Sequence, residues 1–384
     1  MKYVVIGPTY PYRGGISHYT TLLVQNLRRN HDVKLYSYVR QYPAFLFPGK
    51  TDMDPSELPL RADCEYLIDP INPLTWVKTF WRIRREDPDA LILQWWVPYW
   101  TPTLAGISFL VKAFTSVKIV YICHDVTPPL EGGPFDRHLA RFVLRRGDSH
   151  IVHSRDSLEK LRQMLPEDDV HLTVVPTYDM FNDGCPPDRS EAQARLGVHG
   201  RTILFFGFVR LYKGLEYLLQ ALPEVLKKMN VQLLIAGEFW IPESYYRQFI
   251  HDENVAKRVK IVNRYIPNEE VPDYFAAADV VVFPYVAGSQ SAAVQLAYGF
   301  GKPVIVTDAG GIADVVKDGR TGLVVPPRNS QALAEAIIRY FEDGLGERFT
   351  AEIQKVEERS LFAWENLVRL IERLTVASTD RHIS

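Results

Sequence analysis

Cysteine, net charge and long apolar runs are all scarce in this chain of 384 residues. Its three cysteines are far apart and odd in number, which fits neither a disulfide framework nor a zinc cluster. A formal charge of −2 argues against a generally basic nucleic-acid binder, because phosphate-backbone binding needs a strong cationic excess. The longest apolar stretch, around LAGISFLVKAF, is interrupted by Lys112 and is too short to span a bilayer. No apolar signal segment precedes the first predicted strand, so we expect a cytoplasmic protein with reduced thiols.

The chain alternates short β-rich apolar runs with helical stretches, and Gly, Pro or Asp marks each switch. This alternation is typical of βαβ units and a parallel sheet. The predicted strands form two sets, YVVIG, DVKLYSY, DALILQWW, VKIVYICHD and SHIVHS up to residue 154, and RTILFFG, VQLLIAGE, VKIVNRY, ADVVVFPY, KPVIVTD and GLVVPP from residue 201. Between them, residues 173–197 are predicted to be a linker. We therefore predict an α/β protein with two Rossmann-like, doubly wound halves around a cleft, which bind ligands outside the carboxyl ends of the strands.

Two features of the first half follow predicted strands. Gly14 and Gly15 precede a helix, where close backbone approach and exposed amides suit an anion or a sugar, although a plain tight turn explains them equally well. The third spaced glycine of a dinucleotide fingerprint is absent, which disfavours NAD or FAD. His124 ends a buried strand before a rigid proline turn. This position predicts a side chain that faces the cleft, or one that is satisfied by neighbouring backbone.

Four further residues are candidates for the acceptor side of the cleft: His18, Trp95, Asp125 and His153. His18 lies near the glycine turn, Asp125 follows His124, and His153 ends another strand. Trp95 offers a flat apolar surface that can stack on a sugar or be buried in the core.

The second half carries stronger signals. Arg210 and Lys213 lie between a strand and a helix that begins at Leu215. AGSQSAAVQLAYGFGKPVI then gives a small-residue loop that opens a helix, with Ser289 or Ser291 as its expected N-cap. Free backbone amides and the helix dipole make such a start an anion site. Gly310 and Gly311 again let the backbone approach a ligand closely, and Asp314 lies in the helix that is predicted to follow. Cations that face a helix amino terminus predict a diphosphate site.

Four stretches of the second half resemble the donor domain of glycosyltransferase family 4, the retaining nucleotide-sugar transferases of GT-B fold. They are FFGFVRLYKGLEYLLQAL, VQLLIAGE, YIPNEEVPDYFAAADVVVFPY and GFGKPVIVTDAGGIADVVKDGRTGLVVPP. The first half agrees more loosely, through GPTYPYRGGISHYTTLL and VYICHD, and RSLFAWENLVRLIERL resembles the family's final helix. The resemblance implies an acceptor domain over residues 1–178, a donor domain over 179–358 and a helix in 359–384 that returns to the first domain.

The resemblance also implies roles. Arg210 and Lys213 match the family's diphosphate-binding pair, separated by a shorter loop than usual, and with His124 they would be the catalytic residues. The expected donor-binding residues are Gly14, Gly15, Glu238, Ile266, Gln290, Ser291, Ala292 and Ala293. The implied reaction moves a sugar from a UDP or GDP donor to a saccharide or lipid-linked acceptor in polysaccharide or glycan synthesis, with retention, no metal or other cofactor and no nucleic-acid partner.

One departure concerns ribose recognition. The family usually carries two glutamates eight positions apart before GKPV, and this chain has Gly288 and Leu296 there. We expect Glu238, or Gln290 with Ser291, to contact the nucleotide instead, because one helical step turns Gln295 to another face. The missing glutamates also keep open a non-catalytic nucleotide-sugar sensor, and the fold keeps open an epimerase.

Two arginine-rich segments predict a basic amphipathic surface on the acceptor domain. They are TFWRIRRE, with Arg82, Arg84 and Arg85, and RFVLRRG, with Arg141, Arg145 and Arg146. Such a surface suits peripheral contact with the inner face of a membrane, and solvated helix faces are the alternative.

Overall fold

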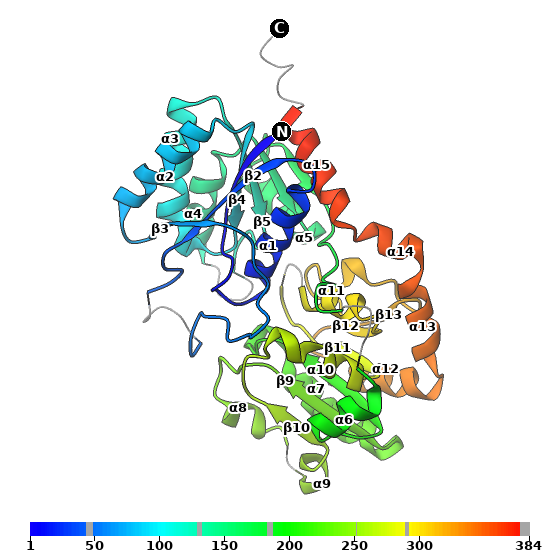
Figure 1. The fold of residues 1–384 in the computed structure, drawn as a ribbon. Coiled ribbons are helices and arrows are strands. Elements are labelled where there is room, and N and C mark those ends of the chain that lie inside the picture. The colour runs from blue at the N-terminus through cyan, green and yellow to red at the C-terminus, as the bar shows by residue number, and fades with distance from the viewer. Residues whose placement is uncertain (44–48, 129–132, 183–186, 251, 289–291, 377–384) are drawn as a thin grey trace. The chain divides into compact units, whose positions relative to one another are not determined.

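The computed structural model describes residues 1–43, 49–128, 133–182, 187–250, 252–288 and 292–376. The chain forms two compact units (Figure 1). Unit 1 contains Met1–Asp54, Pro59–Val174 and the chain from Ala363 onward, and unit 2 contains Pro55–Leu58 and Val175–Phe362.

Unit 1 is built on a seven-stranded parallel sheet in the order β3-β2-β1-β4-β5-β6-β7. Its strands are β1 (Lys2–Ile6), β2 (Asp32–Tyr38), β3 (Glu65–Ile68), β4 (Ala90–Trp95), β5 (Lys118–Cys123), β6 (Ser149–Val152) and β7 (Val170–Leu172). Its helices are α1 (Gly15–Leu27), α2 (Pro73–Glu86), η1 (Pro98–Trp100), α3 (Thr101–Phe114), α4 (Pro134–Leu144), α5 (Arg155–Met164) and α15 (Trp364–Val376).

Helices cover both faces of this sheet, with α2, α3 and α4 on one face and α1 and α15 on the other (Figure 1). Helix α5 lies on the first of these faces, since its Leu161 and Met164 belong to the same apolar core as α2, α3 and α4. Alternate strand residues divide between the faces because successive side chains of a strand point in opposite directions. Val4, Leu91 and Ile119 join Phe80 and Leu104 in one apolar core under α2 and α3. Burial on both faces explains why the central strands are nearly continuous apolar runs.

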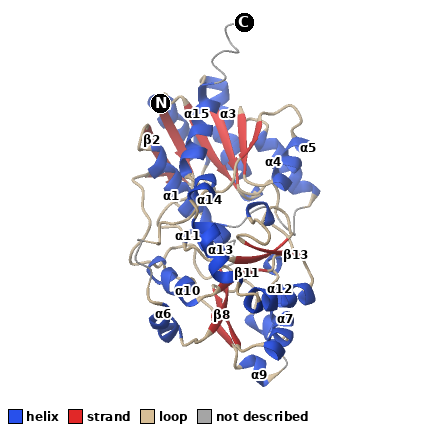
Figure 2. Cartoon of the chain, turned by 90° about the vertical axis from the view of Figure 1, so that its right-hand side faces the viewer, coloured by secondary structure: helices blue, strands red, loops and turns tan. Residues whose placement is uncertain are grey.

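Unit 2 is built on a six-stranded parallel sheet in the order β10-β9-β8-β11-β12-β13. Its strands are β8 (Arg201–Phe206), β9 (Val231–Ala236), β10 (Val259–Val262), β11 (Val280–Phe283), β12 (Val304–Thr307) and β13 (Gly322–Val325). Its helices are α6 (Arg189–Leu196), η2 (Leu211–Lys213), α7 (Leu215–Lys228), α8 (Glu243–Arg247), α9 (Glu253–Ala256), η3 (Asn268–Glu270), α10 (Val271–Ala277), α11 (Ala292–Gly299), η4 (Ala313–Val315), α12 (Ser330–Glu342), α13 (Leu345–Gln354) and α14 (Val356–Leu361). Figure 2 shows the strands of each sheet enclosed by helices.

The eleven predicted strands are confirmed, and the two parallel sheets confirm the predicted α/β class. The sequence missed β3 and β7, which have four and three residues and lie at the two sheet edges. Edge strands bury less surface and so leave a weaker apolar pattern. The linker prediction for residues 173–197 was wrong at its end, where Asp188 caps α6 through the backbone N–H groups of Ser190 and Glu191.

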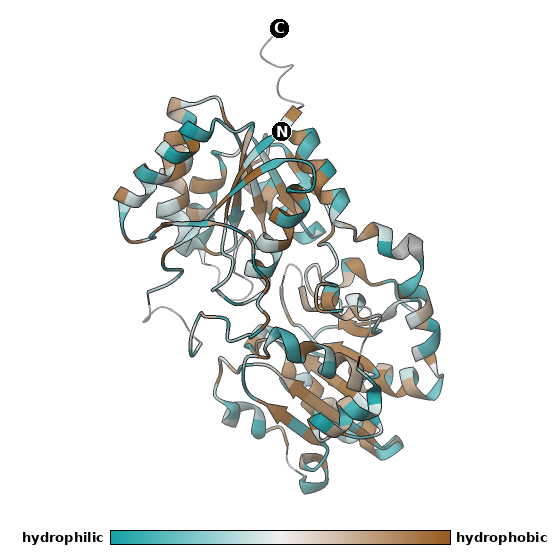
Figure 3. Cartoon of the chain, in the orientation of Figure 1, coloured by the Kyte–Doolittle hydropathy of each residue, from teal (hydrophilic) through white to brown (hydrophobic). Residues whose placement is uncertain are grey.

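None of the described helices is both long and apolar enough to cross a membrane. Figure 3 shows that the strands are the most hydrophobic elements and that most helices carry both polar and apolar residues. The two units are therefore two α/β cores, each organised around a buried sheet.

Candidate functional site

The loops at the carboxyl ends of β8 and β9 in unit 2 touch backbone to backbone. A Cβ added to Gly237 would lie 2.0 Å from the carbonyl oxygen of Gly207, and Gly237 has a φ of +151°. Only glycine fits this approach. The carbonyl of Glu238 then accepts a hydrogen bond of 2.9 Å from Val209 N–H, so the two loops continue side by side.

The loop after β8 also joins the loop after β11, and that loop joins the one after β12. Val286 N–H donates to the Tyr212 carbonyl at 2.8 Å, and Gly311 N–H donates to the Gly288 carbonyl at 3.2 Å. A Cβ on Gly310 would lie 1.7 Å from the Gly288 oxygen. Four strand ends of one sheet therefore form a single cluster of close-packed backbone, the arrangement that brings amide donors to a ligand.

Lys213 places a buried ammonium in this cluster. The residue is only 8% exposed, and its Nζ lies 5.3 Å from the centre of the Tyr285 ring. Burial lowers the pKa of Lys213, and the neighbouring Arg210 lowers it further, while Tyr212 acts in the opposite direction. No carboxylate of the described residues forms an ion pair with Lys213. An anion is the natural partner for a buried cation without a counter-charge.

Arg210 lies between two aromatic rings. Its guanidinium carbon is 5.1 Å from the centre of the Tyr212 ring and 4.9 Å from that of Trp240, and Trp240 packs 4.9 Å from Phe208. Cation–π contacts of this kind orient the guanidinium. The sequence pattern did not predict these aromatic residues, because Trp240 reaches Arg210 only through the packing of the loops that follow β8 and β9, where its N–H donates to the Val209 carbonyl at 3.0 Å.

The other predicted donor residues have mixed outcomes. Glu238 is buried beside the cluster and Ile266 is buried after β10, while Ala292 and Ala293 begin α11 as expected of a helix start. Gln290, Ser291 and Ser289 lie outside the described residues.

No described residue makes a hydrogen bond to Oε1 of the buried Gln295, and Leu296 is also buried. Asp314 lies in the single 3-10 turn η4, where a helix was predicted.

His124 is buried at the end of β5 in unit 1. Its Nε2 lies 2.7 Å from Oε1 of Gln94, and its ring meets that of Tyr19 edge-on at 4.6 Å. Burial holds the pKa of His124 well below its usual range, and His153 lowers it further. The imidazole is therefore neutral, and it is oriented by Gln94, which no sequence pattern predicted.

Two acceptor-side predictions need correction. Trp95 is fully buried in the core and its indole N–H points to the Val126 carbonyl at 3.4 Å, so it offers no face to a sugar. His153 is buried with both ring nitrogens used. Nδ1 donates to the Thr173 carbonyl at 3.0 Å, and Nε2 accepts from the Tyr19 hydroxyl at 3.0 Å. Burial lowers the pKa of His153 to about 4, so its imidazole is neutral near pH 7, and no ring nitrogen is left to bond an acceptor.

The remaining predictions of unit 1 lie around the start of α1. Gly14 is the N-cap of α1 and has a φ of +106°, and Gly15 is exposed at the first helical position. The positive φ explains a glycine at this turn. Nε2 of His18 lies 3.9 Å from Oδ2 of Asp54, and Asp125 is half-buried after β5. These residues remain candidates without a demonstrated ligand.

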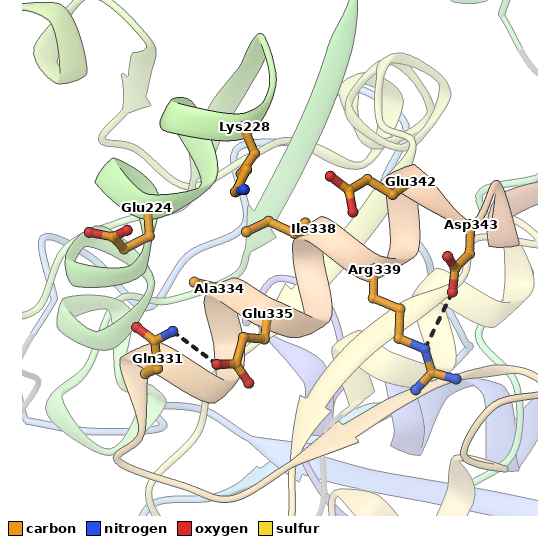
Figure 4. A pocket seen from close by; sticks show the side chains of 9 residues that line it. All are labelled: Glu224, Lys228, Gln331, Ala334, Glu335, Ile338, Arg339, Glu342 and Asp343. Atoms are coloured by element: carbon orange, nitrogen blue, oxygen red, sulfur yellow. Dashed lines mark hydrogen bonds and ion pairs between the residues drawn. The ribbon is translucent and has the colours of Figure 1, made fainter.

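A surface groove of unit 2 is not this site (Figure 4). It lies between α7 and α12 and is lined by Glu224, Lys228, Gln331, Ala334, Glu335, Ile338, Arg339, Glu342 and Asp343. Glu224 and Lys228 belong to the last turns of α7, which lead into the amino end of β9. These residues of the groove therefore lie toward the amino ends of the strands, whereas Arg210 and Lys213 lie at the carboxyl ends. Within the described ranges, no three His, Cys, Asp or Glu side chains gather as a metal centre would require.

Comparison with known proteins agrees with this architecture. Residues 14–177 match the family described as glycosyl transferase 4-like domain, and residues 200–343 match glycosyl transferases group 1. The chain is 30% identical over 310 residues to D-inositol 3-phosphate glycosyltransferase of a Nocardioides species, covering 71% of this chain and 64% of the relative. It is 25% identical over 254 residues to alpha-D-kanosaminyltransferase of Streptomyces kanamyceticus, covering 64% of each. The matches thus span less than two thirds of either relative.

Among solved structures, Anabaena Alr3699/HepE in complex with UDP and glucose superposes with a TM-score of 0.75 at 19% identity, over 98% of this chain and 100% of that one. Sucrose-phosphate synthase from Thermosynechococcus elongatus gives a TM-score of 0.73 at 19% identity, over 99% of both chains. At this identity the likeness establishes the GT-B fold, and the two family matches cover both halves of the chain. The chain belongs to glycosyltransferase family 4 and is a glycosyltransferase of GT-B fold.

Proposed function

We propose that this enzyme transfers a sugar from a nucleoside-diphosphate donor to a saccharide or lipid-linked saccharide, with retention at the anomeric carbon, in polysaccharide or glycan synthesis. The observation that carries the proposal is the pair of cations Arg210 and Lys213 at the glycine-lined strand ends of unit 2, where no described carboxylate pairs with Lys213. Solved proteins of the same fold contain UDP, UDP-glucose or ADP, which supports a nucleotide-sugar donor.

The proposed chemistry follows the charge that develops on the leaving diphosphate. When the bond between the sugar and the diphosphate breaks, negative charge grows on the leaving phosphate oxygen. Arg210, Lys213 and the amides at the start of α11 would stabilise that charge more in the transition state than in the ground state. In this proposal the two cations and the helix dipole compensate the diphosphate without a metal ion.

His124 would contact a hydroxyl or the ring oxygen of the transferred sugar. Because burial holds its imidazole neutral, this contact would be a hydrogen bond and not an ion pair. No residue is assigned as a strong general base, and in the proposal the leaving phosphate removes the proton of the acceptor hydroxyl. That last step rests on analogy with the family.

Glu238 is the proposed contact to the nucleotide in place of the family's second glutamate. It is 2% exposed and follows Gly237 in the loop that touches the loop after β8. Leu296 at the expected position cannot accept a hydrogen bond from a ribose. The absent carboxylate is also the observation that favours the second candidate, a nucleotide-sugar sensor without turnover.

Incubation of the enzyme with a panel of UDP, GDP and ADP sugars tests the proposal. A transferase should release free nucleoside diphosphate slowly from one donor without acceptor, and faster with the correct acceptor, and NMR of the product should show the donor's anomeric configuration. A changed sugar on an intact nucleotide would identify an epimerase. Tight binding of a donor without any turnover would identify the sensor and contradict the proposed transfer.

A further inference from the structure

Three neighbouring helices of unit 1, α2, α3 and α4, form one layer that exposes large apolar side chains. Helix α3 contacts both α2 and α4, and Figure 1 shows the three helices over the same face of the sheet. Their inner sides contribute Phe80, Ile83, Leu104, Val111 and Val143 to one core. The opposite sides of these helices therefore point away from the sheet.

Large apolar side chains lie on these outward sides. Trp81 is 57% exposed and Phe135 is 72% exposed. The full set is Leu74, Val77 and Trp81 on α2, Phe109 and Phe114 on α3, and Phe135 and Phe142 on α4. Single exposed apolar residues are ordinary, but aromatic residues gathered on three adjacent helices indicate an interaction surface.

Arginines without a counter-charge accompany the aromatic residues. Arg84 and Arg85 on α2 and Arg141 and Arg145 at the end of α4 are exposed, and none forms an ion pair with a carboxylate of the described residues. The guanidinium carbon of Arg84 lies 5.3 Å from the centre of the Trp81 ring. That of Arg145 lies 5.2 Å from the centre of the Phe142 ring. Each pair thus presents a cation and a ring together.

The acidic residues of these helices are occupied elsewhere. Glu86 forms an ion pair with Lys2 at 2.8 Å, and Asp136 accepts a hydrogen bond from Gly133 N–H at the start of α4. Arg82 is 3.6 Å from Glu65, so it is not among the unpaired arginines. Arg146 donates to the Phe142 carbonyl and is partly buried. The six arginines predicted from sequence reduce to four that are available to a partner.

We propose that the exposed sides of α2, α3 and α4, here called the α2–α4 surface, bind the headgroup region of an anionic lipid bilayer. Aromatic side chains are favoured at the boundary between headgroups and acyl chains, and guanidinium groups near them pair with anionic headgroups. The arginines lie on two helices among exposed aromatic rings. A bilayer can accept both, since its headgroups are anionic and its acyl chains are apolar, whereas an acidic protein surface offers less apolar contact. The inference extends the proposed function, since a lipid-linked acceptor would be reached from such a surface.

Co-sedimentation of the full chain with vesicles tests the inference and needs no sugar donor, so its outcome is independent of the proposed transfer. We expect binding to phosphatidylglycerol vesicles at about 0.05 M salt, little binding to phosphatidylcholine vesicles, and release at about 0.5 M salt. The double variant Arg84→Gln/Arg85→Gln should lower the partition coefficient by about fivefold for each arginine. The matched control Lys228→Gln/Lys257→Gln removes two exposed cations of unit 2 and should bind like the parent chain.

The rings give a second readout. Trp81→Ala/Phe142→Ala should weaken binding even at low salt, and brominated acyl chains should quench tryptophan fluorescence in the parent more than in Trp81→Phe. Absence of vesicle binding, equal binding to both lipids, or equal loss in the arginine variant and its lysine control would overturn the inference. Retention on polyglutamate without vesicle binding would instead identify an acidic protein partner.

Discussion

Burial and charge oppose each other directly at Lys213 of unit 2. Removing a lysine from water without a carboxylate partner disfavours its charged form, which is the physical cause of its lowered pKa. An enzyme that must hold a diphosphate gains from this arrangement, because the ligand supplies the missing counter-charge. The ammonium lies beside the backbone cluster, since a Cβ added to Gly207 would lie 3.1 Å from Lys213 Nζ.

His124→Ala should lower kcat more than donor affinity, because its proposed partner is the reacting sugar and not the nucleotide. The loss of one hydrogen bond in the transition state predicts a fall in kcat of about tenfold. Steady-state kinetics and donor titration measure the two quantities separately. Small and equal effects on both would indicate that His124, with Gln94 and Tyr19, only stabilises unit 1.

His153 makes stability depend on pH. Its pKa is about 4 in the folded chain and about 6.5 in the unfolded chain, so below pH 6.5 the unfolded state binds more protons. The free energy of unfolding should therefore fall as the pH drops from about 6.5 to about 4, by up to about 1.4 kcal/mol per pH unit. Denaturant unfolding of the parent and of His153→Gln measures the difference. The variant should have a shallower slope, and identical slopes would contradict a buried neutral His153.

At the scale of the element, the loops that follow β8, β11 and β12 depend on glycine. Gly310 has a φ of +59°, and its added Cβ would lie 1.7 Å from the Gly288 oxygen. Gly310→Ala should force these loops apart and lower both stability and diphosphate affinity. Gly319 is the matched control, because it has a φ of +70° but no atom within 4 Å of an added Cβ.

Gly319→Ala should cost about 1–2 kcal/mol from its left-handed backbone and leave affinity unchanged. Thermal unfolding and nucleoside-diphosphate titration compare the two variants. Equal behaviour of Gly310→Ala and Gly319→Ala would show that contact between the loops does not support the site.

The elements also show what the sequence could predict. Long apolar runs such as Ile203–Phe206 predicted the buried strands, because burial on both faces leaves a continuous signal. Short edge strands such as Val170–Leu172 carry no such signal. Positions after strands predicted Arg210 and Lys213, but the aromatic rings of Trp240 and Tyr285 around them depend on tertiary packing. The same limit explains Trp95, whose sequence context fits a sugar platform and a core residue equally well.

At the scale of the whole molecule, each unit is held together across long stretches of sequence. Trp364 of α15 packs 5.3 Å from Tyr19, and Nε2 of His31 lies 2.7 Å from Oε1 of Glu372. The last described helix is thus part of unit 1, although it follows unit 2 in the chain. Unit 1 is therefore built from segments that precede unit 2 in the sequence and a segment that follows it.

The central claim is that unit 2 binds a nucleoside diphosphate through Arg210 and Lys213, and calorimetric titration of UDP, GDP and ADP tests it most directly. A charge-assisted contact contributes about 1.5–3 kcal/mol, so Arg210→Ala and Lys213→Ala should each weaken binding of the preferred diphosphate by at least about tenfold. Lys228→Ala, an exposed lysine of the groove in Figure 4, should leave binding unchanged. Parent-like affinity in both Arg210→Ala and Lys213→Ala, with the fold intact, would contradict the account.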